Sequence, residues 1–341
     1  MSSKITGCGA LFYTLDTQRF LLLHRTQSKQ NQVWGLVGGT TTNENLWEGL
    51  QREIKEEIGD QNIIKRIPME TFISNDENFL YHTYICVVEK EFIPNLNEKF
   101  HKLFSGAFET GIEPDEWNWR QGRDPENVTR QICNAWKSDK SIKDLVCHEA
   151  IGKACAQLMN WTGSRLLQDN VLWKPPGGKT LSYHQDAAYD DWISPQTMMT
   201  CWIPLDDVSQ EKGTLEYVKG SHLWGLAPPR GQFHSPDDYK KELTNFAKKN
   251  DKKIEIQYVE VPAGGVAFHH GYTWHGSGIN NSQDNRRAVV AHCVPSDAEF
   301  HPTNVGGTAR IYKKYKKLNS NELEESFFPI LWTKKGYRTN V

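Results

Sequence analysis

The sequence predicts two domains in a row: an α+β domain in the first hundred residues and a mainly β jelly roll, a double-stranded β-helix, in the rest. Three observations support this fold class. The chain has 341 residues, which is enough for two domains. Its N-terminal part combines strand-like runs with one amphipathic helix. After residue 184, short strand-like runs follow one another across turns rich in Gly, Pro, Asp and Ser, without long helices between them.

The composition excludes several classes of protein. The formal net charge is -2, so we expect neither a nucleic-acid partner nor an anionic membrane partner. The seven cysteines are scattered and odd in number, which argues against a disulfide framework or a thiolate zinc site. No apolar run approaches the roughly 20 residues that span a bilayer, and the N-terminus lacks the apolar region of a signal peptide. We therefore expect a soluble, cytoplasmic protein.

Two hairpins are expected to flank one helix in the first ninety residues. Their four strands are runs rich in β-branched, aromatic and other apolar residues, at 5–14, 19–25, 63–74 and 79–89. Between the hairpins, residues 46–58 carry apolar side chains at helical spacing. Asn43 or Asn45 is expected to cap the start of this helix, and Gly59 stands where it ends.

Three carboxylates share one face of this predicted helix. Glu53, Glu56 and Glu57 stand at positions i, i+3 and i+4. Like charges at this spacing repel one another, and a hard divalent cation such as Mg²⁺ would turn the repulsion into attraction. The pattern therefore indicates a metal site, with a solvated, charge-rich helix face as the alternative.

The same segment resembles the Nudix box. That pattern is a glycine, five residues, a glutamate, seven residues, and then Arg-Glu-aliphatic-x-Glu-Glu-x-Gly-aliphatic. Here the frame runs from Gly38 through Glu44 to Gly59, with Asp60 in place of the last aliphatic residue and Val37 in place of the proline that the family commonly has. Neither departure affects an expected metal ligand.

This resemblance implies an α/β/α sandwich that hydrolyses a nucleoside diphosphate linked to another group. Glu53, Glu56 and Glu57 would hold Mg²⁺ or Mn²⁺, with the Gly38 carbonyl as a further oxygen ligand. Arg52 would orient Glu56 or Glu57. The metal would stabilise the pyrophosphate and help to generate the attacking hydroxide.

Further along the chain, two histidines and an aspartate have the spacing of an iron site. His184 and Asp186 are two apart on an expected strand, so their side chains point to the same face. With His275 they would form a 2-His-1-carboxylate triad, which covers one face of an iron(II) ion and leaves the other positions open. Arg286 follows across a Gly/Asn-rich turn and can hold a carboxylate bidentately.

From about residue 98 to the end, the chain resembles the phytanoyl-CoA dioxygenase family of Fe(II)/2-oxoglutarate oxygenases. The matching segments are HQD at 184–186, TCWIPLDD at 200–207, GTLEYVKGSH at 213–222, VPAGGVAFHHGYTWHGSG at 261–278 and NRRAVVAHC at 285–293. One His-x-Asp pair alone would be a weak signal. The pair, the distal histidine, the arginine and the glycine blocks in this order are together specific.

The resemblance assigns six residues: His184, Asp186 and His275 as iron ligands, and Arg286, Ser277 and Trp202 around the distal carboxylate of 2-oxoglutarate. The implied reaction consumes O₂ and 2-oxoglutarate, releases succinate and CO₂, and hydroxylates a small-molecule substrate. Related halogenases replace the carboxylate ligand by a small residue, so the presence of Asp186 favours hydroxylation.

Neighbouring residues compete for these roles. Arg287 is the rival of Arg286, although strand alternation turns it outward. His269 has the strand parity to approach the metal and is kept as a candidate, whereas the parity of His270 turns it away. His222 belongs to a turn and is expected to be structural.

Two amides on an earlier strand are further candidates for the cofactor site. Gln168 and Asn170 alternate with apolar residues in the strand expected at 164–173. If their face is the barrel interior, they contact the ligand or the backbone, because a buried amide needs hydrogen-bond partners. We also expect helices at 98–108, from about Pro125, and at 148–161.

We place the domain boundary at 1–97 for the Nudix-like domain and 98–341 for the dioxygenase-like domain. No Pro/Gly/Ser linker separates them. Nudix domains usually continue past a segment like residues 92–97 with a strand and a helix, and dioxygenases of the second family usually begin with a helix and a strand. Neither pair is found here, so we expect each domain to lack a peripheral element and the sandwich to be incomplete.

The leading hypothesis is a fused enzyme in which a hydroxylase follows a Nudix hydrolase, with a small molecule, O₂ and a nucleoside diphosphate derivative as partners. An alternative is that Mg²⁺-dependent pyrophosphate hydrolysis is the main activity and that the barrel only binds. A non-enzymatic module and an oxygen-independent cupin are two further alternatives, and the complete triad with Arg286 argues against both.

Overall fold

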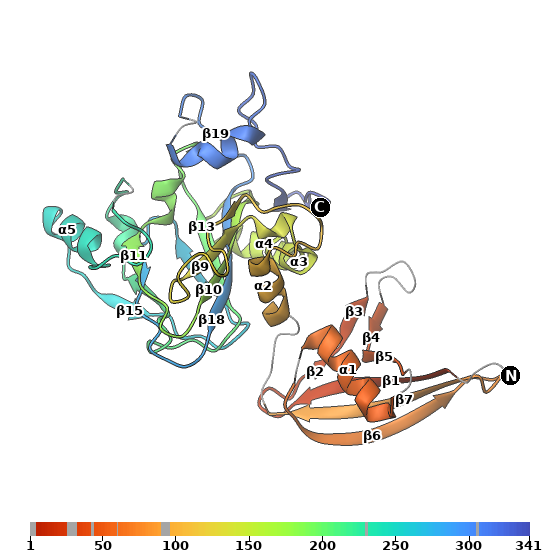
Figure 1. Cartoon of the computed structure of the whole chain (residues 1–341). Helices are drawn as coiled ribbons and strands as arrows, with labels where there is room; N and C mark the ends of the chain where they lie inside the picture. The colour runs from red at the N-terminus through yellow and green to blue at the C-terminus, as the bar shows by residue number, and fades with distance from the viewer. Residues whose placement is uncertain are drawn as a thin grey trace. The chain divides into compact units, whose positions relative to one another are not determined.

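A computed structural model describes residues 5–25, 33–41, 44–59, 61–89, 96–228, 231–304 and 307–341. The chain divides into two compact units, Met1–Lys99 and Phe100–Val341, and each is described by itself (Figure 1). The boundary expected after residue 97 lies close to this division. Among the described residues, no helix is long and apolar enough to cross a membrane. All seven cysteines are buried and free.

The first unit is built on a five-stranded mixed sheet with the order β2-β1-β7-β6, in which β5 also pairs with β1. Its strands are β1 (Ile5–Thr14), β2 (Phe20–Leu21), β5 (Val37–Thr40), β6 (Ile63–Ile73) and β7 (Phe79–Val88). A separate small hairpin joins β3 (Leu23–Arg25) to β4 (Val33–Gly35). The central β1 and β7 run parallel, whereas β6 and β7 form the expected antiparallel hairpin.

Helix α1 (Leu46–Ile58) packs on one face of this sheet (Figure 1). Asn45 caps it, because its side chain accepts from the backbone N–H groups of Trp47 and Glu48 while the Glu48 side chain accepts from Asn45 N. The apolar stripe of the helix, which includes Leu50 and Ile54, is buried in the core. The other expected cap, Asn43, lies outside the described residues.

The expected α/β/α sandwich is only partly present in this unit. Beyond β7, its described residues contain only the beginning of α2 (Leu96–Ser105), so α1 forms one helical layer and the described part of the unit shows no second one. Side chains of the edge strand β6 are accordingly exposed, for example Met69 and Phe72, each at 58%. The reason is chain length, since few residues separate β7 from the second unit.

The second unit is mainly β, as predicted, with two antiparallel sheets and helices around them. One sheet has seven strands in the order β16-β13-β18-β10-β9-β8, with β20 paired to β10, and the other has the order β11-β17-β14-β15. The seven-stranded sheet contains β8 (Glu116–Trp117), β9 (Arg130–Cys133), β10 (Gly163–Lys174), β13 (Met199–Pro204), β16 (Ala267–His270), β18 (Arg286–Pro295) and β20 (Ile330–Thr333). The four-stranded sheet contains β11 (Leu181–His184), β14 (Leu215–Val218), β15 (Ile256–Tyr258) and β17 (His275–Ser277).

Short elements and helices complete this unit. The helices are the remainder of α2 (Leu96–Ser105), α3 (Lys140–Val146), α4 (Glu149–Leu158) and α5 (Lys241–Lys249). The 3₁₀ turns are η1 (Ala135–Lys137), η2 (Asp186–Tyr189), η3 (Ser221–Leu223) and η4 (Gly307–Tyr315). A small pair joins β12 (Ile193–Ser194) to β19 (Glu299–Phe300). The residues of β10 and β18 are almost all buried, which is typical of strands covered on both faces.

Two local predictions in this unit are wrong. No helix begins at Pro125: a turn leads into β9, which pairs antiparallel with residues 170–173 of β10. That pairing is non-local, so it overrides the local helical tendency. His184 and Asp186 also do not lie on one strand, because β11 ends at His184 and Asp186 begins η2. The side chains still converge because Gln185 between them is extended.

The buried carboxylate of Asp169 lets us predict how the stability of the protein depends on pH. Asp169 on β10 is fully buried and accepts hydrogen bonds from the backbone N–H groups of Ala135 and Trp136. Burial raises the pKa of Asp169 to about 7. Since the unfolded value is about 3.9, the folded state binds this proton more tightly, and the stability that the group contributes falls as pH rises from about 4 to about 7.

We therefore expect Asp169→Asn to remove this part of the pH dependence. The free energy of unfolding of the variant relative to wild type should rise by up to about 4 kcal/mol between pH 4 and pH 8, because only the wild type must ionise a buried acid. Denaturant unfolding at several pH values measures the difference. The same difference at every pH would contradict the prediction.

Candidate functional site

A cavity of about 780 Å³ lies in the second unit, with walls from both sheets. The seven-stranded sheet contributes residues of β10, β13 and β18, and the four-stranded sheet contributes β11, β14 and β17. The wall includes the predicted residues Gln168, Asn170, His184, Asp186, Trp202, His275 and Ser277. Strand pairing thus brings side chains that are far apart in the sequence into one cavity.

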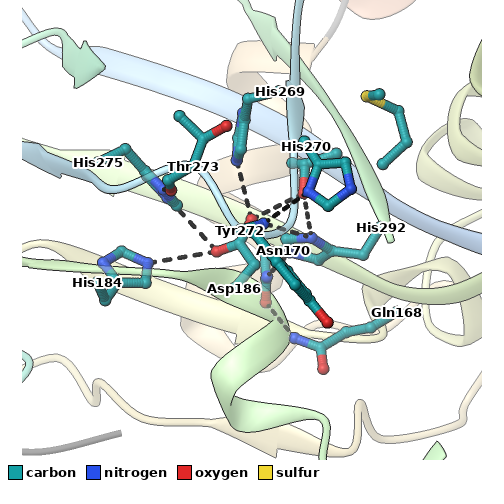
Figure 2. Close-up of polar contacts among 12 residues, drawn as sticks. Gln168, Asn170, His184, Asp186, His269, His270, Tyr272, Thr273, His275 and His292 are labelled. Atoms are coloured by element: carbon teal, nitrogen blue, oxygen red, sulfur yellow. Dashed lines mark hydrogen bonds and ion pairs between the residues drawn. The ribbon is translucent and has the colours of Figure 1, made fainter. Parts of the chain in front are cut away.

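Three side chains of types that can bind a metal converge in this cavity. His184, Asp186 and His275 each offer a ligand atom, and these atoms all lie within 4.8 Å of one another; no other such trio of His, Cys, Asp or Glu occurs in the described part of the chain. Asp186 Oδ1 is 3.3 Å from His184 Nε2 and 3.4 Å from His275 Nε2. Figure 2 shows both imidazoles directed at Asp186.

Backbone carbonyl groups determine which nitrogen of each imidazole, His184 and His275, carries a hydrogen. Nδ1 of His184 lies 2.8 Å from the carbonyl oxygen of Ser182, and Nδ1 of His275 lies 3.0 Å from that of Thr273. A carbonyl only accepts, so each Nδ1 carries a hydrogen, and in the neutral ring the lone pair is then on Nε2. Burial lowers the pKa of His275 well below its usual value, which keeps this imidazole neutral. Two imidazole nitrogens and one carboxylate oxygen are a ligand set that fits iron(II).

The second oxygen of Asp186 is contacted by Thr200 and His269. His269 is a candidate from the sequence alone, whereas Thr200 is not. Thr200 Oγ donates to Asp186 Oδ2 at 2.7 Å. His269 Nε2 lies 2.9 Å from the same oxygen, and Figure 2 shows His269 directed at Asp186. Nδ1 of His269 in turn lies 2.8 Å from the hydroxyl of Tyr217. These contacts leave Oδ1 facing His184 and His275. The strand parity of His269 was the one sequence signal for this group.

Gln168 and Asn170 belong to a chain of hydrogen bonds that ends at Asp186. Gln168 donates to Asn170 at 3.0 Å, and Asn170 Nδ2 lies 2.8 Å from Nε2 of His292. Nδ1 of His292 lies 2.9 Å from Thr200 Oγ, which donates to the carboxylate. Both amides thus line the cavity with protein partners, and a contact with the co-substrate stays a prediction for them.

A buried guanidinium lies in the wall of the same barrel. Arg286 is fully buried, and its Nη1 donates to the carbonyl of Gly213 at 3.2 Å. Its Nε and Nη2, and the Nε1 of Trp202, are buried without a hydrogen-bond partner. Burial lowers the pKa of Arg286 to about 10, so it stays charged at neutral pH. Unpaired buried donors on a cation fit a carboxylate ligand.

The rival residues lie elsewhere. Arg287 forms an ion pair with Asp206 at 2.6 Å, which agrees with the outward direction expected from strand alternation. His270 accepts from the backbone N–H of Tyr272, and its ring lies 5.9 Å from that of His222. Ser277, in contrast, lines the cavity, and its hydroxyl donates to the same Gly213 carbonyl as Arg286, at 2.7 Å.

In the first unit, Arg52 forms ion pairs with two of the three glutamates expected to bind a metal, Glu53 and Glu56, and with Glu44. Its guanidinium donates to Glu44 at 3.0 Å, to Glu53 at 2.8 Å, to Glu56 at 3.1 Å and to the carbonyl of Thr40 at 2.9 Å. The expected contact between Arg52 and Glu56 is therefore present. These ion pairs offset the repulsion among the carboxylates.

Glu57 lies against the glycine segment of the Nudix-like frame. Its Oε2 accepts from the backbone N–H of Gly38 at 2.8 Å. Gly38 has φ +153°, and a Cβ there would lie 2.1 Å from the carbonyl oxygen of Cys8. A Cβ on Gly39 would lie 2.5 Å from the carboxylate of Glu53. The absence of side chains therefore lets the backbone approach the carboxylates closely.

Two family models match the chain. The model described as "Phytanoyl-CoA dioxygenase (PhyH)" matches residues 86–288, and the model described as "NUDIX domain" matches residues 6–124. The two ranges overlap between residues 86 and 124, around the division between the two compact units.

Curated relatives match more than half of the chain. Phytanoyl-CoA dioxygenase domain-containing protein 1 of Danio rerio is 30% identical over 198 residues, which cover 56% of this chain and 65% of that protein. A probable alpha-ketoglutarate-dependent hypophosphite dioxygenase of Stutzerimonas stutzeri is 29% identical over 209 residues, or 61% of this chain and 72% of that protein. The chain thus spans less than two thirds of the first of these relatives.

A solved structure shows the same fold. The epimerase SnoN, crystallised with Fe³⁺, alpha ketoglutarate and nogalamycin RO, matches with a TM-score of 0.50 and 23% identity, over 70% of this chain and 88% of that one. At this identity the likeness concerns the architecture alone.

Proposed function

The chain belongs to the phytanoyl-CoA dioxygenase family, whose model covers more than half of it, and on this basis we propose that it is an iron(II)- and 2-oxoglutarate-dependent dioxygenase that hydroxylates a small molecule. One observation carries the proposal: the trio of His184, Asp186 and His275 shares a barrel with the buried guanidinium of Arg286, whose Nε and Nη2 have no hydrogen-bond partner. The trio suits iron, and the guanidinium suits the far carboxylate of the co-substrate.

The residues divide the work by position. His184, Asp186 and His275 would hold iron(II), which with 2-oxoglutarate supplies the activation of O₂ that side chains cannot. Thr200 and His269 fix the orientation of Asp186 through its second oxygen. Arg286, Ser277 and Trp202 would bind the distal carboxylate.

The cavity defines where a substrate would bind. Its wall combines aromatic side chains, such as Tyr189 and Phe233, with polar groups from the two sheets. The side chains of the cavity wall would hold the reacting C–H bond close to the trio and limit access of water. The relatives' names refer to phytanoyl-CoA and to hypophosphite, so the family's substrates differ widely and the one used here is assigned only as a small molecule.

An anaerobic titration tests the oxygenase proposal. Purified protein is titrated with Fe(II) and 2-oxoglutarate, and the weak visible band of the keto acid chelated to ferrous iron is followed. We expect the band to saturate at one iron and one 2-oxoglutarate per chain. A folded protein that gives no band would contradict the proposal.

A second function is favoured by the match to the NUDIX domain model. We propose that Glu53, Glu56 and Glu57, with the Gly38 carbonyl, hold Mg²⁺ or Mn²⁺ and that this unit hydrolyses a nucleoside diphosphate derivative. The approach of Glu57 to Gly38 and the contacts of Arg52 with Glu53 and Glu56 support this arrangement. A bound cation would supply the positive charge that three neighbouring carboxylates need.

Glu57→Gln is expected to lower Mg²⁺-dependent hydrolysis by about a hundredfold, because one charged ligand is lost. The measurement is release of nucleoside monophosphate from a panel of nucleoside diphosphate sugars by the full chain. Glu70→Gln, an exposed glutamate on β6, serves as the matched control. Wild type that releases no monophosphate with any compound would contradict the hydrolase proposal and leave the barrel as the active unit.

A further inference from the structure

A fully buried lysine lies directly behind the proposed co-substrate site. Lys174 is the last residue of β10 and has no exposed surface. Its Nζ lies 2.5 Å from Ser277 Oγ and also donates to the carbonyl of Gly278. An ammonium has three N–H donors, so one of them has no partner among the described residues. Neither the iron trio nor the packing of the core explains this side chain.

The charge of Lys174 is not balanced by the protein. Within the described residues, no carboxylate forms an ion pair with it. Glu216, a carboxylate that acts on it from farther away, already accepts from the hydroxyls of Tyr183 and Tyr239. Burial lowers the pKa of Lys174 well below its usual value, and the neighbouring Arg286 lowers it further. A buried cation beside another cation is unfavourable unless an anion joins them.

Lys174 also controls the direction of the Ser277 hydroxyl. As long as Nζ donates to Ser277 Oγ, the hydroxyl hydrogen must point to a different acceptor. In this structure that acceptor is the carbonyl of Gly213, to which Arg286 donates as well. Gly213 has φ +62°, and a Cβ there would lie 2.6 Å from the carbonyl oxygen of Gly278, so a glycine is required for this approach. Two donors thus converge on one oxygen.

We propose that Lys174 is a positioning residue that makes the site selective for a 2-oxo acid with a second, distal carboxylate. This inference rests on the proposed oxygenase function. Lys174 keeps the Ser277 hydroxyl directed toward the point that Nη1 of Arg286 also faces, and its charge makes that hydroxyl a stronger donor. A distal carboxylate supplies the anion that the pair of buried cations lacks. A monocarboxylic 2-oxo acid supplies no such charge.

A purely structural role is the competing explanation. In that case Lys174 only ties β10 to the turn after β17, and its removal would loosen the whole site. All 2-oxo acids would then bind more weakly, to the same extent. The proposed role instead predicts that the loss is confined to acids with the distal carboxylate.

The test compares two ligands that differ at one end. 2-Oxoglutarate and 2-oxopentanoate share the keto-acid end and chain length, but the second has a methyl group where the first has the distal carboxylate. Dissociation constants for both are measured anaerobically on the Fe(II)-loaded full chain by calorimetry. Wild type, Lys174→Met and Lys174→Gln are compared, and the two neutral variants guard against a folding defect in one. The control is Lys137→Met, at a lysine whose side chain is 11% exposed and is paired with Asp115.

We expect wild type to prefer 2-oxoglutarate strongly over 2-oxopentanoate. In both Lys174 variants the ratio of the two dissociation constants should fall about tenfold, which corresponds to about 1.4 kcal/mol. The dissociation constant for 2-oxopentanoate should change little, and Lys137→Met should keep the wild-type preference. An unchanged preference in both Lys174 variants would overturn the assignment. Wild type that binds neither acid would instead contradict the oxygenase function itself, so the two failures are distinguishable.

Discussion

His275→Ala is expected to lower 2-oxoglutarate turnover on the order of a thousandfold or more, because it removes one of three groups that act as a unit. His275 is buried, and its Nε2 lies 3.4 Å from Asp186 Oδ1. Alanine leaves the proposed metal site with two ligands. The measurements are iron content after desalting, the anaerobic visible band, and succinate formation in the presence of O₂.

His270→Ala is the matched control for this variant. His270 is the nearest other histidine in the sequence, and its Nδ1 accepts from the backbone N–H of Tyr272. Its removal should leave iron content and succinate formation within a few-fold of wild type. If His275→Ala keeps most of the iron and the turnover, or if both variants lose them equally, the assignment of the trio is wrong.

Arg286→Ala is expected to weaken 2-oxoglutarate binding by about a hundredfold, because it removes charge-assisted hydrogen bonds from a buried site. Iron content should be unchanged, since Arg286 is not part of the trio. Unchanged iron content together with weaker 2-oxoglutarate binding distinguishes a specific binding defect from a loss of folded protein. The dissociation constant for 2-oxoglutarate, measured by the same anaerobic band, provides the number.

Arg287→Ala tests whether the effect belongs to that one side chain. Arg287 is the next residue along β18, and its guanidinium pairs with Asp206. Losing this pair is expected to lower stability modestly and to leave the affinity for 2-oxoglutarate near the wild-type value. Unchanged turnover in Arg286→Ala would remove 2-oxoglutarate from the reaction and revive the oxygen-independent alternative.

Much of the local structure could be predicted because it depends on near neighbours in the chain. The helix at 46–58 has its exact bounds, since its apolar stripe and the cap at Asn45 lie within a few residues of each other. The strand expected at 164–173 is also present, as β10, and extends one residue further at each end. The family resemblance pointed to the trio and Arg286 for the same reason, because each of these residues stands in a short, contiguous sequence motif.

The errors arise where distant segments compete with local preference. The region after Pro125 has no helix, because residues 130–133 pair with residues 170–173, about forty positions away. This strand pairing is not encoded in a local pattern. The missing second helical layer of the N-terminal sandwich, in contrast, was expected from the sequence, and the described part of that unit contains none.

The sequence by itself determined which chemical groups this protein has and the strands and helices that carry them. Only the tertiary structure decided which of those groups meet. His269 reaches Asp186 across 83 residues, and Lys174 reaches Ser277 across 103. Hydrophobic alternation directs a side chain inward or outward, but it does not specify its partner. The partner follows from the register of strand pairing, and register depends on the packing of the whole barrel.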